Sequence, residues 1–403
     1  MLRRRLIVLA LLLGGLAPVS TVQSAGNTAA APAKPWTLNL RYRHESVDDD
    51  AFARSAQADT LRVRAALNHR FSPQWTAQVE AEGVVELGDR FNSGANGQTA
   101  YPLVPDARAL ELNQAWLDWA SDEAGFRIGR QMLVLDNARF VGNVAWRQNM
   151  QTFDAAQWRW KPTKAMEVQA LYLDRVHRVN GDEARDPLVR ERRLHAPLLR
   201  VSHTLPGGSL VGYGYWLEDR DVATASTRTL GLRWSAGRSL GDNWKGGLVL
   251  ERAQQVPWSK ATGGSTAYML IEPRLEYGPL LLKAGWERLG AGRARAFQTP
   301  LATLHAFNGW ADKFLVTPVR GLRDTYLSAQ RGFELGGRKS KFELAYHDFR
   351  ADRGAADYGR ELDASLGVNL MPGLDLLAKV ADYRSDGFAR DTRKLWMQLE
   401  WSR

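Results

Sequence analysis

The sequence contains no cysteine among its 403 residues. This absence excludes a disulfide framework, a thiolate nucleophile, a cysteine-based metal site and a lipid anchor on an N-terminal cysteine. Beyond residue 25 the chain also lacks an uninterrupted apolar run of about 18 residues, which a membrane-spanning helix would need. Neither a linker nor a change of composition divides it, so we expect one domain.

Signatures of catalysis are missing as well. Residues 332–338 fail as a phosphate-binding loop because Arg338 stands where lysine is required. No serine lies in a Gly-x-Ser-x-Gly setting, and the seven histidines show no metal-ligand spacing. We therefore expect no enzyme, no cofactor and no metal site, and we interpret the acidic run at residues 48–50 as a solvated outer loop. Cation binding at that run is the alternative.

Basic residues are in excess, with a net charge of +10, but they recur at strand spacing instead of clustering. That distribution argues against a nucleic-acid partner. Arg3, Arg4 and Arg5 are a special case, because they precede the apolar stretch 6–16. This arrangement is typical of a secretory signal peptide, which we assign to residues 1–25. Residues 26–35 then form a short lead, and residues 36–403 form the single expected domain.

Aromatic residues are abundant: they make up 10% of the chain, and 15 of them are tryptophan. Residues 36–43, 61–68 and 75–86 each place apolar side chains on one face and charged or amide side chains on the other. This two-residue period is typical of strands with one apolar face, in a soluble sandwich or in a barrel.

The connections between these segments decide between the two folds. Short turns alternate strictly with longer polar stretches, and together they join about eighteen strands. Sandwiches do not sort their connections by length, whereas outer-membrane barrels have short periplasmic turns and long extracellular loops. Phe71, Trp75, Trp160, Trp244 and Tyr277 flank the short turns, as an aromatic girdle would. The sequence therefore predicts an all-β, transmembrane antiparallel β-barrel.

Residues 130–154 follow neither a helical nor a strand period. They are rich in arginine, asparagine and glutamine, yet they carry Phe140, Trp146 and Phe153. Such a stretch is typical of a long loop with its own packed interior. It is the third long connection, and we expect it to fold into the pore and set its width.

Two blocks of motifs resemble the alginate-export family of outer-membrane barrels. The first comprises Leu112-Asn113-Gln114-Ala115, Gly129-Arg130-Gln131, Leu135-Asp136 and the run from Arg139 through Asn143, Trp146 and Asn149 to Asp154. The second comprises Gly285-Trp286-Glu287, Leu289-Gly290, the run from Phe297 to Phe314, and Asp391 to Trp396 near the C-terminus. The resemblance implies a monomeric barrel with an electropositive pore.

Basic residues on the polar face of the expected strands are the candidate solute path: Arg41, Arg62, Arg64, Arg159, Arg233 and Lys379. Fixed guanidinium groups attract anions, and arginine can hold a carboxylate through two hydrogen bonds. The alternative is a solvated wall in which these residues pair with Glu80, Glu82, Asp363 and similar acids.

The candidate constriction comprises Arg130, Asp136, Arg139, Asn143, Arg147, Gln148 and Asp154. We expect Arg139 and Arg147 to anchor the loop through Asp136, Asp154 or a wall acid such as Glu111. A second loop contains His305, Asn308, Trp310, Asp312 and Lys313. Whether it folds inward or forms an outer plug is left open.

We expect a channel in the bacterial outer membrane that passes an anionic polysaccharide or oligosaccharide. A general or small-anion porin, and a barrel with a structural or assembly role, are the alternatives. The expected partners are outer-membrane lipid and lipopolysaccharide, the barrel-assembly machinery, the anionic solute and periplasmic export proteins.

Overall fold

The structure, a computed structural model, describes residues 34–403. The signal peptide expected at residues 1–25 and most of the following lead lie outside this part of the chain. Eighteen strands account for nearly all of the regular structure. The elements in chain order are β1 (Trp36–Asp49), β2 (Ala56–Arg70), β3 (Trp75–Glu86), β4 (Ala109–Ala120), β5 (Ala124–Gln131), β6 (Thr152–Thr163), β7 (Met166–His177), α1 (Pro187–Arg190), β8 (Glu191–Leu205), β9 (Gly208–Asp219), η1 (Ala223–Ala225), β10 (Thr227–Ser239), β11 (Trp244–Pro257), β12 (Thr266–Tyr277), β13 (Leu280–Leu289), η2 (Leu304–Ala306), β14 (Leu322–Leu335), β15 (Arg338–Arg350), β16 (Asp357–Met371), β17 (Leu374–Ser385) and β18 (Thr392–Ser402).

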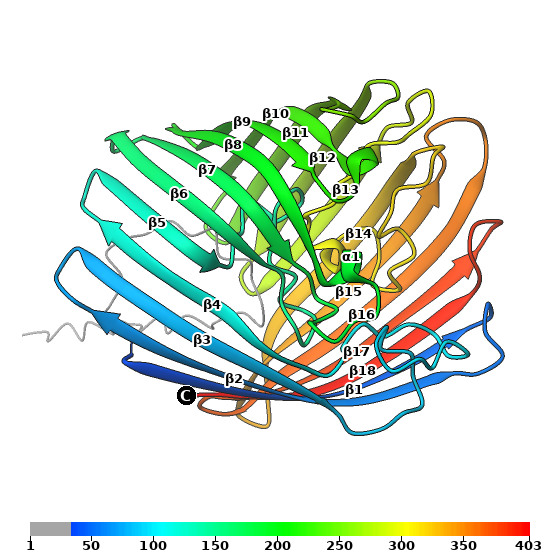
Figure 1. Ribbon diagram of the computed structural model, residues 1–403. Coiled ribbons are helices and arrows are strands. Elements are labelled where there is room, and N and C mark those ends of the chain that lie inside the picture. Colours follow the sequence, from blue (N-terminus) through cyan, green and yellow to red (C-terminus); the bar gives the residue numbers. More distant parts are fainter. Residues whose placement is uncertain (1–33) are drawn as a thin grey trace, which may run out of the picture.

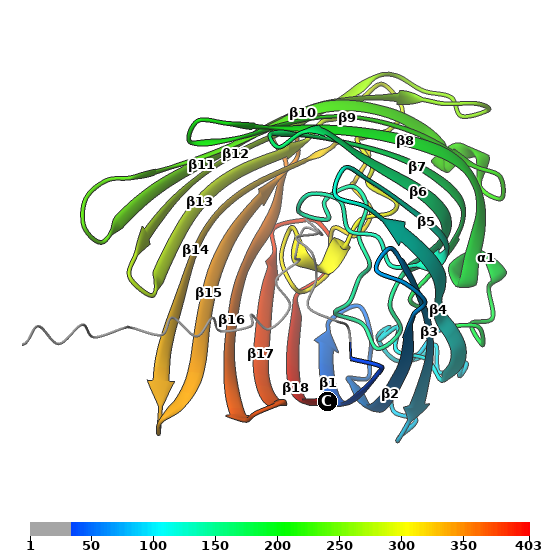
Figure 2. The ribbon, with the colours of Figure 1, turned by 90° about the vertical axis from the view of Figure 1, so that its left-hand side faces the viewer.

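Each strand pairs antiparallel with the strands before and after it, and β1 pairs with β18. This last pairing runs from Asn39 opposite Ser402 to Asp49 opposite Thr392. The sheet is therefore a closed barrel, whose strands surround the interior in Figures 1 and 2. Closure removes the unpaired edges that an open sheet would expose, so every strand has a partner on both sides. The predicted 18-stranded antiparallel barrel is confirmed.

Connections of two to four residues join the strands at one end of the barrel, and longer loops join them at the other. Among the long loops are the second (residues 87–108), the third (132–151), the seventh (290–321) and the eighth (351–356). α1, η1 and η2 all lie in long connections. Within the described residues, no helix is long and apolar enough to cross a bilayer.

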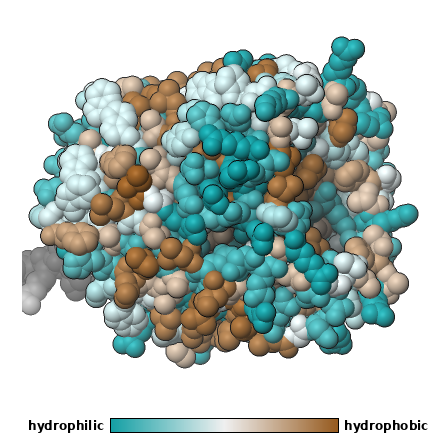
Figure 3. All heavy atoms as spheres, viewed as in Figure 1, coloured by the Kyte–Doolittle hydropathy of each residue, from teal (hydrophilic) through white to brown (hydrophobic). Residues whose placement is uncertain are grey.

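Apolar side chains cover the outer face of the strands. Leu67, Leu110 and Leu327 are among the most exposed of them. In Figure 3 brown and white patches lie over the strands, while the teal surface gathers over the long loops around α1. Near the short turns the rings of Trp244 and Tyr277 contact each other, with centroids 4.6 Å apart, and both side chains are exposed. Exposed apolar surface with an aromatic border is the pattern expected of a wall that faces lipid.

The largest buried cluster lies inside the barrel. It joins inward-facing residues of the wall, such as Leu173 and Tyr268, to loop residues such as Leu135, Val141 and Phe297. The interior on the long-loop side is therefore packed with apolar groups, and the loops that supply them position the candidate site.

Candidate functional site

The third loop folds into the barrel. In Figure 2 its cyan trace lies inside the ring of strands, beside the yellow seventh loop. Phe140 from the loop contacts wall rings, with its centroid 5.3 Å from those of Tyr213 and Tyr268. Trp146 packs with its ring 5.8 Å from the inward-facing Trp396 of β18. These contacts partly bury Phe140 and Trp146, whereas Phe153, the third aromatic residue that marked the loop in the sequence, belongs to β6 and is fully buried.

Arg130 and Asp154 differ from the expectation, because they belong to β5 and β6 and not to the loop. Arg130 shares the outward face of β5 with Phe126 and Ile128, both of which are exposed. Its Nε lies 2.8 Å from Asp154 Oδ1, and His177 lies 2.9 Å from the other carboxylate oxygen. This pair therefore joins neighbouring strands on the outer face of the wall and does not line the interior.

The third and seventh loops bind each other directly. Val141 and Leu301 form a short parallel bridge, in which Gly142 N donates to Leu301 O at 2.9 Å. Thr303 N donates to Ala138 O at 3.0 Å, and the Gln151 amide donates to Leu301 O at the same distance. The seventh loop is thus an inward loop, and the two loops form one packed unit.

Arg139 fixes this unit to the wall at β13. Its Nε donates to Glu287 Oε1 at 2.7 Å, and its Nη2 donates to Asn308 Oδ1 at 2.9 Å. Asn308 in turn donates to Glu287 Oε2 at 2.6 Å, so the third loop, the seventh loop and the wall meet at one carboxylate. Both charged side chains are almost fully buried. A carboxylate of the wall anchors Arg139, which agrees with one of the expected types of partner. The residue is Glu287, however, and not Glu111, Asp136 or Asp154.

Arg147 ties the opposite end of the third loop to β1. Its Nη1 lies 3.0 Å from Glu45 Oε2, and its Nη2 lies 3.1 Å from Asp312 Oδ2 of the seventh loop. Gln148 donates from its amide nitrogen to Thr60 Oγ1 at 2.9 Å. These contacts satisfy polar groups that would be costly to bury alone, at about 1–3 kcal/mol each.

Two further polar residues of the third loop make separate contacts. Asp136 accepts from Arg200 of β8 at 2.8 Å, which holds the loop to a third part of the wall. Asn143 is buried and donates to Met132 Sδ at 3.2 Å within the loop. Three ion pairs to three separate wall strands therefore hold the third loop, and Asn143 supports its internal shape.

Lys379, His305 and Asp312 form a buried chain of hydrogen bonds. Lys379 Nζ donates to His305 Nε2 at 2.7 Å, and His305 Nδ1 lies 2.8 Å from Asp312 Oδ1. Burial lowers the pKa of His305 to about 3, so its neutral ring accepts from the lysine and donates to the aspartate. Trp146 stacks on the His305 ring at 4.8 Å. The Trp146 ring in this position covers Lys379, which is buried.

Aromatic rings surround the Lys379 ammonium. It lies 3.7 Å from the ring centroid of Trp310 and 4.2 Å from that of Trp146. A cation over an indole face is attracted by the ring quadrupole. Lys379 points inward, as its position in the two-residue period of β17 predicts. Its contacts, however, connect the wall to the two loops and do not face the solute path.

The tip of the seventh loop presses closely on β16. Gly309 has a φ of 82°, and a Cβ there would lie 2.3 Å from the Glu361 carboxylate. Because glycine allows this approach, the backbone N–H of Ala311 reaches Glu361 at 2.6 Å and that of Trp310 reaches Asp363 at 3.2 Å. Lys313, further along, pairs with Asp49 of β1 at 2.7 Å.

Backbone strain gathers in the same two loops. Of the seven non-glycine residues with positive φ in residues 34–403, five lie there. They are Asp136, Ala138, Val144, Asn308 and Asp312. Such conformations cost about 1–3 kcal/mol each and persist only where the surroundings impose them. The loops are therefore held in one conformation by the contacts described above.

Arg41 and Arg62 face the interior and share one carboxylate. Glu400 lies 3.0 Å from Arg41 Nη2 and 3.2 Å from Arg62 Nη2. Arg41 also donates to the third-loop carbonyl of Ala145 at 3.2 Å. Glu80 and Glu82 lie beside this pair, next to Arg64, so these three inward-facing arginines together face three carboxylates.

The sharing of one carboxylate by two arginines recurs on the opposite flank of β3. Asp118 of β4 accepts from Arg127 at 2.8 Å and from Arg159 at 3.1 Å. The Arg127 side chain keeps 23% of its surface exposed and that of Arg159 keeps 11%. Both point inward near the short turns, so this excess charge is open to the interior.

The two remaining arginines of the predicted solute path, Arg64 and Arg233, each have their own carboxylate partner. Arg64 pairs with Glu82 and lies 3.7 Å from Glu80, and Arg233 pairs with Glu251. For these two positions the geometry follows the alternative interpretation of a paired wall.

Several interior residues were not selected from the sequence. Arg43 shares the inward face of β1 with Arg41, is fully buried, and lies 3.3 Å from Asp106 of the second loop. Its position two residues after Arg41, on the same face of the strand, could have identified it from the sequence. Arg127 lies on the eight-residue β5, and Arg200 directly follows Pro197, Leu198 and Leu199, where apolar residues occupy both faces of β8 and the sequence shows no alternation. Glu287 carries no signal of its own, because its role depends on a loop almost 150 residues away.

Residues 34–196 match the family described as alginate export. This match confirms the resemblance over that segment, which includes the first block of motifs and ends before the second. No curated protein matches the chain.

Solved outer-membrane proteins share the fold. Acinetobacter baumannii OccAB3 superimposes with a TM-score of 0.70 at 12% identity, over 91% of this chain and 98% of that one. Pseudomonas aeruginosa OpdK, solved with vanillate, gives 0.68 at 15% identity over 91% and 98%. P. aeruginosa OccK2 (OpdF), in complex with glucuronate, gives 0.66 at 16% identity over 91% and 96%. Identities this low establish the fold only.

Proposed function

From its place in the bacterial outer membrane and its 18-stranded porin fold, we propose that this protein is a diffusion channel selective for small anionic solutes, with carboxylates as the favoured class. The observation that carries the proposal is the sharing of Asp118 by Arg127 and Arg159. One carboxylate cannot neutralise two guanidinium groups. A solute carboxylate can therefore take the place of the missing partner through paired hydrogen bonds.

The inward loops support a small solute over a polymer. The third and seventh loops bind each other and three sides of the wall, so the passage on the long-loop side is narrowed by a rigid unit. Opening it for a wide chain would break several buried ion pairs at once, at about 3–5 kcal/mol for each pair that loses one partner. The structures solved with vanillate and with glucuronate, both small carboxylates, agree with this class.

An anionic polysaccharide is the second candidate. The match of residues 34–196 to the alginate-export family favours it. A polymer of uronic acids presents one carboxylate per sugar and would use the same shared-carboxylate sites in turn. The two candidates differ in length of solute and not in the chemistry that attracts it.

Reversal potentials across planar bilayers under a KCl gradient test the anion selectivity. The wild-type channel is expected to prefer chloride, and the double variant Arg127→Gln/Arg159→Gln is expected to lose most of that preference. Arg193→Gln provides a matched control, because it removes an arginine from the exposed outer rim, where Arg193 pairs with Asp221 at 2.6 Å. An unchanged potential in the double variant would overturn the proposal.

Solute block separates the two candidates. Glucuronate added to the short-turn side should reduce the chloride current, whereas glucose, which has the same size and no charge, should not. A uronic acid oligomer that translocates, detected as current interruptions that shorten with rising voltage, would favour the polysaccharide. Block by the monomer without translocation of the oligomer supports the small-solute channel.

A further inference from the structure

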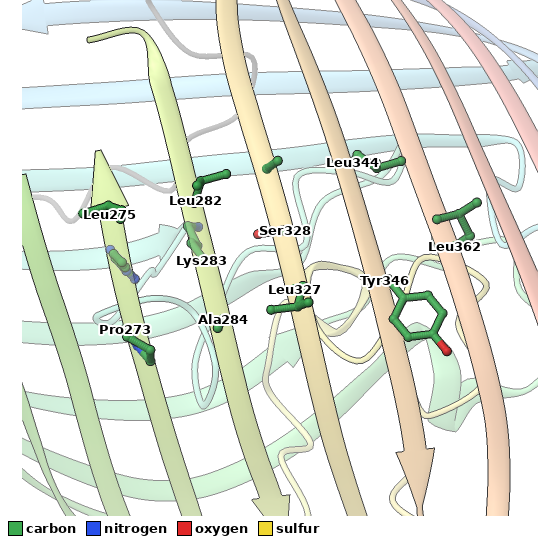
Figure 4. A pocket seen from close by; sticks show the side chains of 12 residues that line it. Pro273, Leu275, Leu282, Lys283, Ala284, Leu327, Ser328, Leu344, Tyr346 and Leu362 are labelled. Carbon is green, nitrogen blue, oxygen red and sulfur yellow. The ribbon is translucent and has the colours of Figure 1, made fainter. Parts of the chain in front are cut away.

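A groove runs across the outer face of the barrel over β12–β16, with a volume of about 470 Å³. Figure 4 shows its lining side chains along the five strands. The apolar members include Pro273, Leu282, Ala284, Leu327, Leu344 and Leu362. The groove faces away from the solute path, so the channel function does not account for it.

The local sequence explains why the wall is hollowed here. Pro273 has no N–H to donate, and the β12–β13 ladder skips from Ile271 opposite Trp286 to Arg274 opposite Lys283. Ala284 lies on β13 within the interrupted stretch of the ladder, and it contributes only a methyl group to the outer face. A gap in the ladder beside small side chains leaves a depression between flanking leucines.

Arginines gather at the long-loop end of the same strands. Arg288 of β13, Arg323 of β14 and Arg350 of β15 lie in register across the outer face. Arg320 of the seventh loop and Arg353 of the eighth loop join them, since Arg320 Nε donates to Arg353 O at 3.2 Å and Arg353 N donates to Arg320 O at 2.9 Å. These five residues are called the rim cluster below.

The carboxylates near the rim cluster do not neutralise it. Asp352 holds Arg288 at 2.5 Å, and Arg350 has Asp348 at 2.8 Å and Asp357 at 3.4 Å. Five arginines thus face three aspartates, which leaves two positive charges. Within residues 34–403, Arg320, Arg323 and Arg353 form no ion pair with any carboxylate.

The spacing between rim cluster and groove fits a membrane lipid. Ala284 and Tyr346 each lie four residues before an arginine of the cluster, and Leu327 lies four residues after Arg323; four residues span about 13 Å along a strand. One leaflet contributes about 15 Å of hydrocarbon. In Figure 4 the Tyr346 ring lies along its strand and its hydroxyl points toward the strand end that carries Arg350.

We propose that this face binds one phosphorylated glycolipid of the outer leaflet, lipopolysaccharide, with a phosphate on the rim cluster and an acyl chain in the groove. Arginine suits phosphate because its planar fork can donate two hydrogen bonds to one anion. A second copy of this chain is a poorer occupant, because a twofold contact through this face would bring two positively charged clusters together.

The test measures lipopolysaccharide binding to the purified full-length protein in detergent, by native mass spectrometry. The double variant Arg323→Ser/Arg353→Ser is expected to bind at least tenfold more weakly than wild type. Arg193→Ser/Arg175→Ser is the matched control, because it removes two arginines at the long-loop ends of β7 and β8, each of which has a carboxylate partner. Equal binding by wild type and the Arg323/Arg353 variant would overturn the proposal.

Further measurements distinguish the contribution of the phosphate from that of the acyl chain. Dephosphorylated lipopolysaccharide should bind as weakly to wild type as the intact lipid binds to the variant. Ala284→Trp, which fills the groove and leaves the rim cluster in place, should also weaken binding. Inorganic phosphate that competes as well as the whole lipid would overturn the role of the groove, and a wild-type dimer that forms without lipid would show a second copy on this face instead. The heat-modifiable gel shift of every variant reports correct folding.

Discussion

Toward the long loops, Arg139 and Arg147 are buried between carboxylates that reach them from the wall and from a second loop. Toward the short turns, Arg127 and Arg159 share a single aspartate and remain partly exposed. The residue type is the same, and its surroundings decide what it does. A saturated and buried guanidinium holds structure together, whereas an under-compensated and hydrated one is available to a solute. Sequence counts of arginine therefore overstate the number that can attract an anion.

The largest effect is expected from deleting the part of the third loop that carries Arg139 and Arg147, the two buried and fully paired arginines. Deletion of residues 137–149 takes away Arg139 and Arg147 together with Phe140 and Trp146, and so removes the third-loop half of the packed unit. Single-channel conductance should rise severalfold, measured in planar bilayers with protein that keeps its heat-modifiable gel shift. Unchanged conductance in a correctly folded deletion would mean that the loop does not limit the pore.

A single anchor should have a smaller effect of the same kind. Arg139→Met leaves Glu287 buried without its cation, which costs about 3–5 kcal/mol. The loops should loosen, and open-channel current noise and hydrogen exchange in residues 132–151 should both increase. Because the loss comes from an unpaired charge, Arg139→Met/Glu287→Gln should recover part of the protection. If the single variant exchanges no faster than wild type, the ion pair does not hold the loop.

The smallest effect is expected at the exposed rim. Arg193 and Asp221 pair at 2.6 Å, but the arginine is well exposed, and such pairs contribute little because water and salt screen them. Arg193→Gln should leave conductance, selectivity and the temperature of the gel shift unchanged. If Arg193→Gln increased current noise and hydrogen exchange as much as Arg139→Met does, buried and exposed ion pairs would not differ in their contribution.

Much of the architecture followed from local patterns. Alternation of polar and apolar residues set which face of each strand points inward, because strand side chains alternate whatever the partner strand is. The inward orientation of Arg41, Arg62 and Arg64 needs only this period. The sorting of connections by length predicted the barrel, because both classes of turn lie at fixed ends of a closed meander. Aromatic residues in a polar stretch likewise marked the third loop as packed.

The pairing of charges was decided only by the tertiary structure. Arg139 lies 148 positions from Glu287, and Arg147 lies 165 positions from Asp312, so no local spacing could match them. Arg130 and Asp154 show the same limit at short range, because the strands extend into the predicted loop and parity turns both side chains outward. Local periodicity fixes orientation because it acts along one chain segment. Which charges neutralise each other depends on how closure of the barrel brings distant segments together, and that in turn decides which arginines remain free for a solute.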